Sequence, residues 1–270
     1  MNRLGFGAMR LTGPGNWGPY PDKPRAERVY RRAIELGVNF IDTAISYGAG
    51  HSEMLIADIL HPYPKDLMIA TKGGNLRSAP GRPYRDGSPS NLRSSCERSL
   101  SYLKVDCIDL YQYHVVDPNT PYEDSIGALA ALQQEGKIRR VGICNVTVEQ
   151  VKTARAITPI VSVQNPYNVR ERACKDVLDY CKAESIAFIP YRPFDRRAYV
   201  QSAPLAETGS LLEPIARRLG ATSGQVALAW LQQQGPNVIP IPGTTSPEHL
   251  EENVAARDIA LSPQDLAALG

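Results

Sequence analysis

Residues 25–44, RAERVYRRAIELGVNFIDTA, join a helix pattern directly to a strand pattern. Apolar residues recur at spacings of three and four from Ala26 onward, which is typical of a helix with one apolar stripe. Gly37 then stands where helices commonly stop. The run that follows, VNFIDTA (38–44), is short and apolar, as in a buried strand. The stretch therefore predicts one helix followed by one strand.

The same pattern recurs along the chain. Eight runs rich in apolar and β-branched residues are predicted strands: RLGFGAM (3–9), VNFIDTA (38–44), LMIATKG (67–73), CIDLYQYH (107–114), RRVGICN (139–145), IVSVQNP (160–166), IAFIPY (186–191) and NVIPIPG (237–243). Segments with helical spacing separate them: 25–37, 51–60, 90–103, 122–136, 147–157, 171–184, 211–220 and 222–235. Thr147 fits a capping box, and Pro247 fits the first position of a further helix.

Because the predicted strands are apolar on both faces, neither face is expected to be exposed to solvent. This favours a parallel sheet that is covered by helices. Eight strand–helix units close such a sheet into a (β/α)8 TIM barrel. An open doubly wound sheet is the rival, but residues 5–19 lack a G-x-G-x-x-G that leads into a helix. The sequence therefore predicts a single barrel domain over residues 1–270. Its longest irregular segments, 10–23, 73–88 and 192–207, follow strands at the end where barrel enzymes place their sites.

The composition narrows the function classes. The net charge is only +2 and the arginines are scattered, so no basic stripe for nucleic acid is present. No signal-peptide pattern and no apolar run of about 18 residues occurs, which predicts a cytoplasmic protein without membrane segments. The five cysteines form no C-x-x-C pair and the four histidines no ligand-spaced pair. Reduced thiols and no bound metal are expected.

Four polar side chains follow three neighbouring predicted strands. Asp42 ends the second strand, and Tyr47 lies in the loop after it. Lys72 ends the third strand and His114 ends the fourth. Carboxyl ends of neighbouring barrel strands meet at one mouth, so these groups are expected within a few ångströms of one another. Each alone is more often a cap or a structural residue, and their joint placement favours a catalytic role.

This set of side chains suits proton transfer at an oxygen atom. A nearby lysine cation favours the phenolate form of a tyrosine, and a buried lysine stays charged only beside a carboxylate. Lys72 and Asp42 are expected to act on Tyr47 in this way, while His114 hydrogen-bonds the substrate oxygen. Tyr47 would then move one proton while another group moves a hydride.

Seven motifs, in this order, resemble the aldo-keto reductase family: GFGAMRL (5–11), NFIDTAISYG (39–48), ATKGG (70–74), LYQYH (110–114), EGKIRRVGICN (135–145), VQNPYN (163–168) and PGTTSPEHLEEN (242–253). The likeness covers nearly the whole chain. It implies a (β/α)8 barrel that binds a nicotinamide cofactor without a Rossmann motif and reduces aldehydes and ketones. It also carries the family's catalytic tetrad to Asp42, Tyr47, Lys72 and His114, with Tyr47 as the general acid.

The resemblance implies cofactor positions as well. Asn145 and Gln164 match the amides that bind the nicotinamide carboxamide, and Tyr191 matches the aromatic ring that stacks on the nicotinamide. Arg192 is expected to pair with the pyrophosphate. The further matched positions are Gly7, Ala8, Met9, Asp42, Cys144, Pro193, Phe194, Gly243, Thr244, Thr245, His249, Glu252 and Asn253.

NADPH is the cofactor that the resemblance implies, and a small carbonyl compound is the implied substrate. Cys144 stands where a serine is common, and His249 stands where an arginine commonly holds the 2′-phosphate, so NADH use stays open. Two alternatives also stay open. One is a non-catalytic NADP(H)-binding subunit, and the other is a pathway-specific ketoreductase or alcohol dehydrogenase that acts on a sugar or natural product. The oligomeric state is left open.

Overall fold

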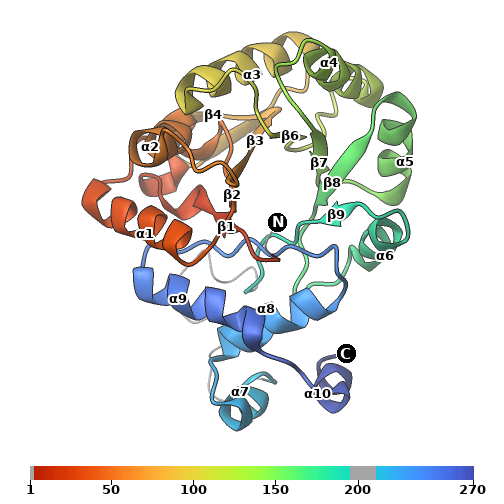
Figure 1. Cartoon of the computed structure of the whole chain (residues 1–270). Helices are drawn as coiled ribbons and strands as arrows, with labels where there is room; N and C mark the ends of the chain where they lie inside the picture. Colours follow the sequence, from red (N-terminus) through yellow and green to blue (C-terminus); the bar gives the residue numbers. More distant parts are fainter. Residues whose placement is uncertain (1–2, 195–210) are drawn as a thin grey trace.

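The computed structural model describes residues 3–194 and 211–270. Seven parallel strands form one sheet in the order β1-β2-β3-β6-β7-β8-β9, and Figure 1 shows them as a ring inside an outer ring of helices. The strands are β1 (Phe6–Gly7), β2 (Phe40–Asp42), β3 (Met68–Gly73), β6 (Leu110–Tyr113), β7 (Val141–Cys144), β8 (Ile160–Gln164) and β9 (Ala187–Phe188). Each lies within one of the first seven predicted runs.

Residues 237–243 close the ring between β9 and β1. The amide of Ile239 donates to the carbonyl of Phe188 in β9 (2.9 Å), and the amide of Gly7 in β1 donates to the carbonyl of Pro242 (3.1 Å). The prolines of this segment have no N–H, so it cannot build a regular ladder of hydrogen bonds. The eighth predicted strand therefore occupies its place as an extended segment, and the predicted (β/α)8 barrel is confirmed.

Helices surround the ring of strands (Figure 1). They are α1 (Lys23–Glu35), α2 (His51–Leu60), α3 (Pro89–Leu103), α4 (Tyr122–Gln134), α5 (Val148–Ile157), α6 (Lys175–Ala183), α7 (Glu213–Leu219), α8 (Ser223–Gln233), α9 (Pro247–Ala255) and α10 (Pro263–Leu269). Of these, α7 and α10 lie farther out, beyond α8 (Figure 1). The capping box of Thr147 and Gln150 begins α5, and Pro247 lies in the first turn of α9. In the described ranges, no helix combines the length and the apolar character needed to cross a membrane.

The prediction of an irregular segment over 73–88 is wrong for most of its length. It contains β4 (Asn75–Ala79) and β5 (Arg82–Arg85), which pair as an antiparallel hairpin. Arginine, proline and serine replace alternating apolar residues here, so no period of two marks the strands in the sequence. Of the predicted irregular segment 192–207, residues 195–207 lie outside the described residues.

The barrel interior has an apolar layer below a polar one. Strand segments alone supply the apolar cluster, which comprises Phe40, Ala70, Leu110, Ile189, Ile239 and Ile241. In β2, β3 and β6, a polar residue follows each cluster member by two positions: Asp42, Lys72 and Gln112. Residues two apart on a strand face the same side, so the polar residues also point into the barrel, nearer its carboxyl end. A larger apolar layer lies between strands and helices.

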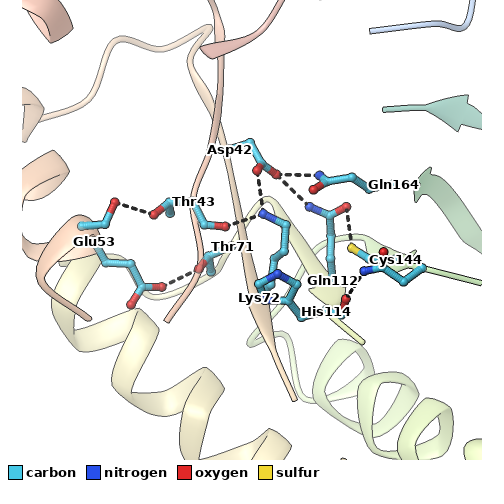
Figure 2. A network of polar contacts seen from close by, with 11 residues as sticks. Asp42, Thr43, Glu53, Thr71, Lys72, Gln112, His114, Cys144 and Gln164 are labelled. Atoms are coloured by element: carbon cyan, nitrogen blue, oxygen red, sulfur yellow. Dashed lines mark hydrogen bonds and ion pairs between the residues drawn. The ribbon is translucent and has the colours of Figure 1, made fainter. Parts of the chain in front are cut away.

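A second buried polar group joins α2 to the sheet behind this layer. The carboxyl of Glu53 is fully buried and accepts a hydrogen bond of 2.5 Å from the Thr71 hydroxyl, as Figure 2 shows. Ser52 and Thr43 share a further hydrogen bond of 2.8 Å beside it. Burial raises the pKa of Glu53 to about 7, against the opposing effects of the Thr71 bond and the Arg98 and Lys72 charges. Glu53 therefore retains its proton in a substantial fraction of molecules near neutral pH.

Truncation of the interior cluster should cost much of the stability. Ile189 is fully buried inside the ring, and Ile189→Ala leaves a cavity that strands on every side cannot fill. We expect a loss of about 2–5 kcal/mol in the free energy of unfolding, measured by urea denaturation. Ile157→Ala removes the same atoms from a side chain that is 39% exposed and should change stability by about 1 kcal/mol or less. Equal losses in the two variants would contradict the assignment of this layer as the barrel core.

The buried carboxyl of Glu53 should make stability depend on pH. Its pKa of about 7 in the folded chain exceeds the value near 4.3 of an unfolded glutamate, so the folded state binds more protons between these limits. Stability from this group is present at low pH and is lost as pH rises through 7. Between pH 5 and 8 the wild type should lose roughly 2 kcal/mol more than Glu53→Gln.

Denaturation curves at a series of pH values measure this difference. Glu149→Gln serves as the control, because the Glu149 side chain is 80% exposed. Its free energy of unfolding should follow the wild-type pH profile. If the wild-type and Glu53→Gln profiles also run parallel, Glu53 is ionised throughout and the expectation is wrong.

Candidate active site

A buried ion pair lies at the carboxyl ends of β2 and β3. Lys72 Nζ donates to Asp42 Oδ1 at 2.6 Å and to the carbonyl oxygen of Thr43 at 2.8 Å, and Lys72 is fully buried (Figure 2). The other carboxylate oxygen, Asp42 Oδ2, accepts from Gln112 Nε2 (3.1 Å) and Gln164 Nε2 (2.9 Å). Two charges removed from water need this number of partners to persist. The side chains of four strands, β2, β3, β6 and β8, thus meet in one network.

Tyr47 reaches the same place from the loop after β2. It begins the 3₁₀ helix η3 (Tyr47–Gly50), and Lys72 Nζ lies 5.1 Å from the centroid of its ring. Gly48 follows with a φ of 64°, and a Cβ there would lie 2.6 Å from the carbonyl oxygen of Gly18. Only glycine fits this left-handed, crowded position without strain. The backbone after Tyr47 is therefore fixed by local sterics.

His114 completes the group from the end of β6. Its ring meets that of Tyr47 edge-on, with centroids 5.9 Å apart. Burial, together with the positive charges of Lys72 and Arg77, lowers the pKa of His114 well below its ordinary value. The imidazole is therefore neutral at physiological pH and carries a single N–H. Among the described residues, buried Nδ1 has no hydrogen-bond partner, which favours the tautomer with the proton on Nε2.

A cavity of about 340 Å³ opens above these residues. It brings together most of the residues that the sequence predicts for catalysis and cofactor binding: Gly7, Met9, Asp42, Tyr47, His114, Asn145, Gln164, Tyr191, Arg192, Pro193, Phe194 and Gly243. Lys72, Ala8 and Cys144 are buried behind its wall. The thiol of Cys144 donates to Gln112 Oε1 at 3.8 Å, and burial raises the pKa of this thiol.

The predicted amide and aromatic residues form one side of the cavity. Tyr191 Oη donates to Asn145 Oδ1 (2.6 Å), and Asn145 Nδ2 donates to the carbonyl oxygen of His114 (2.8 Å). Asn145 itself adopts a φ of 58°, a conformation that asparagine tolerates better than most residues. Gln164 ends β8, which lies two strands from β6 in the sheet, and its Nε2 donates to Asp42. Planar amides beside a flat ring are a donor set that suits a nicotinamide with its carboxamide.

The closing segment 242–253 reaches the cavity with Gly243 and continues beyond it. Thr245 lines a second hollow of about 280 Å³, which shares Met9, Arg10 and Asn16 with the first. Inside the segment, the Ser246 amide donates to the Thr244 hydroxyl (3.1 Å), and the His249 amide donates to the Ser246 hydroxyl (3.2 Å). His249 is exposed and Asn253 is buried. The predicted anion site at this helix N-terminus therefore has two of its amides satisfied internally.

The sequence did not single out three polar residues of this region. Gln112 interrupts an apolar strand, and that interruption is a signal that could have identified it. Arg77 lines the cavity from the β4–β5 hairpin, which the sequence did not predict. Arg25 of α1 donates from Nε to the carbonyl oxygen of Thr245 (2.6 Å), a contact between segments far apart in the sequence. No local pattern marks the last two.

Two curated proteins are similar to this chain over its whole length. An uncharacterised oxidoreductase of Schizosaccharomyces pombe is 44% identical over 269 residues, covering 100% of this chain and 86% of its own length. Pyridoxine 4-dehydrogenase of Escherichia coli is 41% identical over 275 residues, covering 100% of this chain and 94% of its own.

A solved structure shows the same architecture. The aldo-keto reductase from Klebsiella pneumoniae in complex with NADPH aligns with a TM-score of 0.84 and 25% identity, over 100% of this chain and 90% of that one. The family model described as "Aldo/keto reductase family" matches residues 3–270. The chain therefore belongs to the aldo-keto reductase family.

Proposed function

We propose that this protein is an NADP(H)-dependent oxidoreductase that interconverts an aldehyde or ketone and the corresponding alcohol, with Tyr47 as the general acid. The observation that carries the proposal is the position of Tyr47 at the cavity, between the Lys72–Asp42 ion pair and the neutral His114. Aldo-keto reductase membership supports the reaction class. The individual roles of the four residues belong to the proposal.

Each residue has a separate task in the proposed reaction. Lys72, held charged by Asp42, favours the phenolate that Tyr47 becomes after it gives its proton to the substrate oxygen. His114 donates from Nε2 to the same oxygen and positions it. Because burial and two cations keep the imidazole neutral, Tyr47 remains the proton donor. In the direction of alcohol oxidation, the same groups take the proton back.

The cofactor is proposed to occupy the side of the cavity formed by Asn145, Gln164 and Tyr191. When bound, a nicotinamide supplies or accepts the hydride. Tyr191 stacks on its ring, and the two amides bind its carboxamide. Gln164 Nε2 is committed to Asp42, so its carbonyl oxygen is the end that remains for a ligand donor. The relative from Klebsiella pneumoniae, solved in complex with NADPH, supports NADPH as the first choice.

The first substrate pair to test is pyridoxine and pyridoxal. The Escherichia coli relative named pyridoxine 4-dehydrogenase matches this chain over its whole length at 41% identity, which favours an aromatic aldehyde and its primary alcohol. A panel of aliphatic, sugar and aromatic carbonyl compounds tests the alternative substrates in parallel. A pathway-specific ketoreductase would reduce one of these narrowly, and a general reductase would reduce several.

Removal of the Tyr47 hydroxyl should abolish most of the turnover. Tyr47→Phe keeps the ring beside Lys72 and His114 and removes the proton donor. We expect kcat to fall by about 10²- to 10⁴-fold, with NADPH affinity unchanged, measured by NADPH absorbance and by quenching of intrinsic fluorescence. Tyr84→Phe is the matched control, because the Tyr84 side chain is 46% exposed on β5 and should change neither quantity. If wild type and Tyr47→Phe bind NADPH but reduce the panel equally poorly, the protein is a non-catalytic binding subunit.

Cofactor preference should depend on the charge at position 249. We expect the wild type to bind NADPH more tightly than NADH, and His249→Arg to strengthen NADPH binding by roughly fivefold without affecting NADH. Fluorescence titration with both cofactors, at two salt concentrations, measures the change. Glu251→Gln alters charge on the same helix, outside the predicted cofactor positions and without adding a cation, and serves as the comparison. Tighter binding of NADH by the wild type would replace the NADPH assignment.

A further inference from the structure

Arg77 lines the cavity from the β4–β5 hairpin. It lies in β4, whose pairing with β5 brings Leu76 opposite Tyr84. The Arg77 Nε donates to the carbonyl oxygen of Ser46 at 3.1 Å, immediately before Tyr47 in the chain. One of the three guanidinium nitrogens is thus fixed by the loop that carries Tyr47. Its remaining nitrogens are available to a ligand in a fork that matches two oxygen atoms.

The hairpin is also held at its base, where Arg85 pairs with Asn75. The carboxylate of Asp117 accepts from the amide of Gly87 (2.9 Å), and Arg85 Nη1 donates to the carbonyl oxygen of Val116 (3.3 Å). The backbone hydrogen bond from Gly87 chiefly lowers the pKa of Asp117, so this anchor is ionised at neutral pH. At the turn of the hairpin, the amide of Gly81 donates to the carbonyl oxygen of Gly15 (3.0 Å), so β4 holds Arg77 at a defined place on the cavity wall. A residue placed in this way loses little freedom on binding a ligand.

The charge around Arg77 is unbalanced. In residues 3–194 and 211–270, no ion pair joins Arg77 to a carboxylate, and its hydrogen bond goes to a backbone oxygen. The carboxylate that lines the cavity, Asp42, already accepts from Lys72, Gln112 and Gln164. Arg77 acts electrostatically on both Tyr47 and His114, which places its charge near the site of reaction. A partly buried cation without a counter-charge attracts an anionic ligand.

We infer that Arg77 determines specificity for carbonyl substrates that carry an anionic oxygen group, such as a carboxylate, close to the reacting carbonyl. The guanidinium binds that group while the carbonyl oxygen lies between Tyr47 and His114. This inference rests on the proposed function. It adds a requirement that the tetrad alone does not impose, since the tetrad interacts with the carbonyl oxygen and not with substituents.

Matched aldehydes that differ in one charge test the role of Arg77. The substrates are 2-, 3- and 4-carboxybenzaldehyde, each compared with the neutral formylbenzamide of the same substitution, at saturating NADPH. For the isomer that fits, the wild type should favour the carboxylate in kcat/KM by about tenfold or more. Arg77→Met should lower kcat/KM for the carboxylates, through KM, by about tenfold or more beyond any loss that it causes for the neutral aldehydes. Arg77→Lys, which keeps the charge, should retain most of the preference.

Arg82→Met is the control for the hairpin, because Arg82 lies on β5 with its side chain exposed and does not line the cavity. It should leave the carboxylate preference unchanged. Equal losses for charged and neutral aldehydes in Arg77→Met would overturn the inference, since Arg77 would then only brace the Tyr47 loop through Ser46. No preference in the wild type for any isomer would overturn it too.

Failure of the proposed function gives a different result. In that case the wild type binds NADPH and reduces neither member of any pair. Calorimetry with isophthalate in the presence of NADPH then decides the role of Arg77 without turnover. An anion site is supported if wild type and Arg77→Lys bind isophthalate and Arg77→Met binds it about tenfold or more weakly. Equal binding of isophthalate to all three proteins excludes the site.

Discussion

The buried ion pair between Lys72 and Asp42 is the interaction on which the rest of the site depends. Removing two charges from water costs several kcal/mol each, and a direct contact of 2.6 Å offsets this only with further hydrogen bonds. Those bonds come from Gln112 and Gln164 to Asp42 and from Lys72 to a backbone carbonyl of Thr43. The donors lie on strands that only a closed, staggered barrel brings together. The buried polar network and the barrel geometry therefore constrain each other.

The same constraint explains why the barrel interior changes character along its axis. Phe40, Ala70 and Leu110 fill the interior with apolar side chains, and two residues later the same strands carry Asp42, Lys72 and Gln112. The apolar layer excludes water from below, which keeps the ion pair in a medium where its charges act strongly on neighbouring groups. Glu53 lies outside this layer and, unlike Asp42, has no ion pair with a cation among the described residues. Without a cation in contact, its burial raises the pKa to about 7.

Features that depend on short runs of sequence could be predicted. Features that depend on contacts between segments far apart in the sequence could not. Apolar runs identified all eight positions of the ring, including 237–243, where prolines suppress the ladder but not the extended path. The tetrad was predictable because Asp42 and Lys72 end apolar strands, where a charge stands out. The hairpin of β4 and β5 was not, because its residues lack alternation and its pairing is stabilised by contacts such as Gly87 with Asp117. The position of Arg77 followed from that pairing alone.

The cations around the site act differently on Tyr47 and on His114. Lys72 lies beside the Tyr47 ring, and with Arg77 it also disfavours a second positive charge on the partly buried imidazole. A positive field stabilises an anion forming on a phenol or on a substrate oxygen, and it destabilises an imidazolium by the same Coulomb term. In the proposed reaction, proton donation therefore falls to the phenol, and His114 serves as a neutral hydrogen-bond donor. The physical origin of this proposed division is the positive charge of Lys72 beside the phenol, whose partner Asp42 already accepts hydrogen bonds from Gln112 and Gln164.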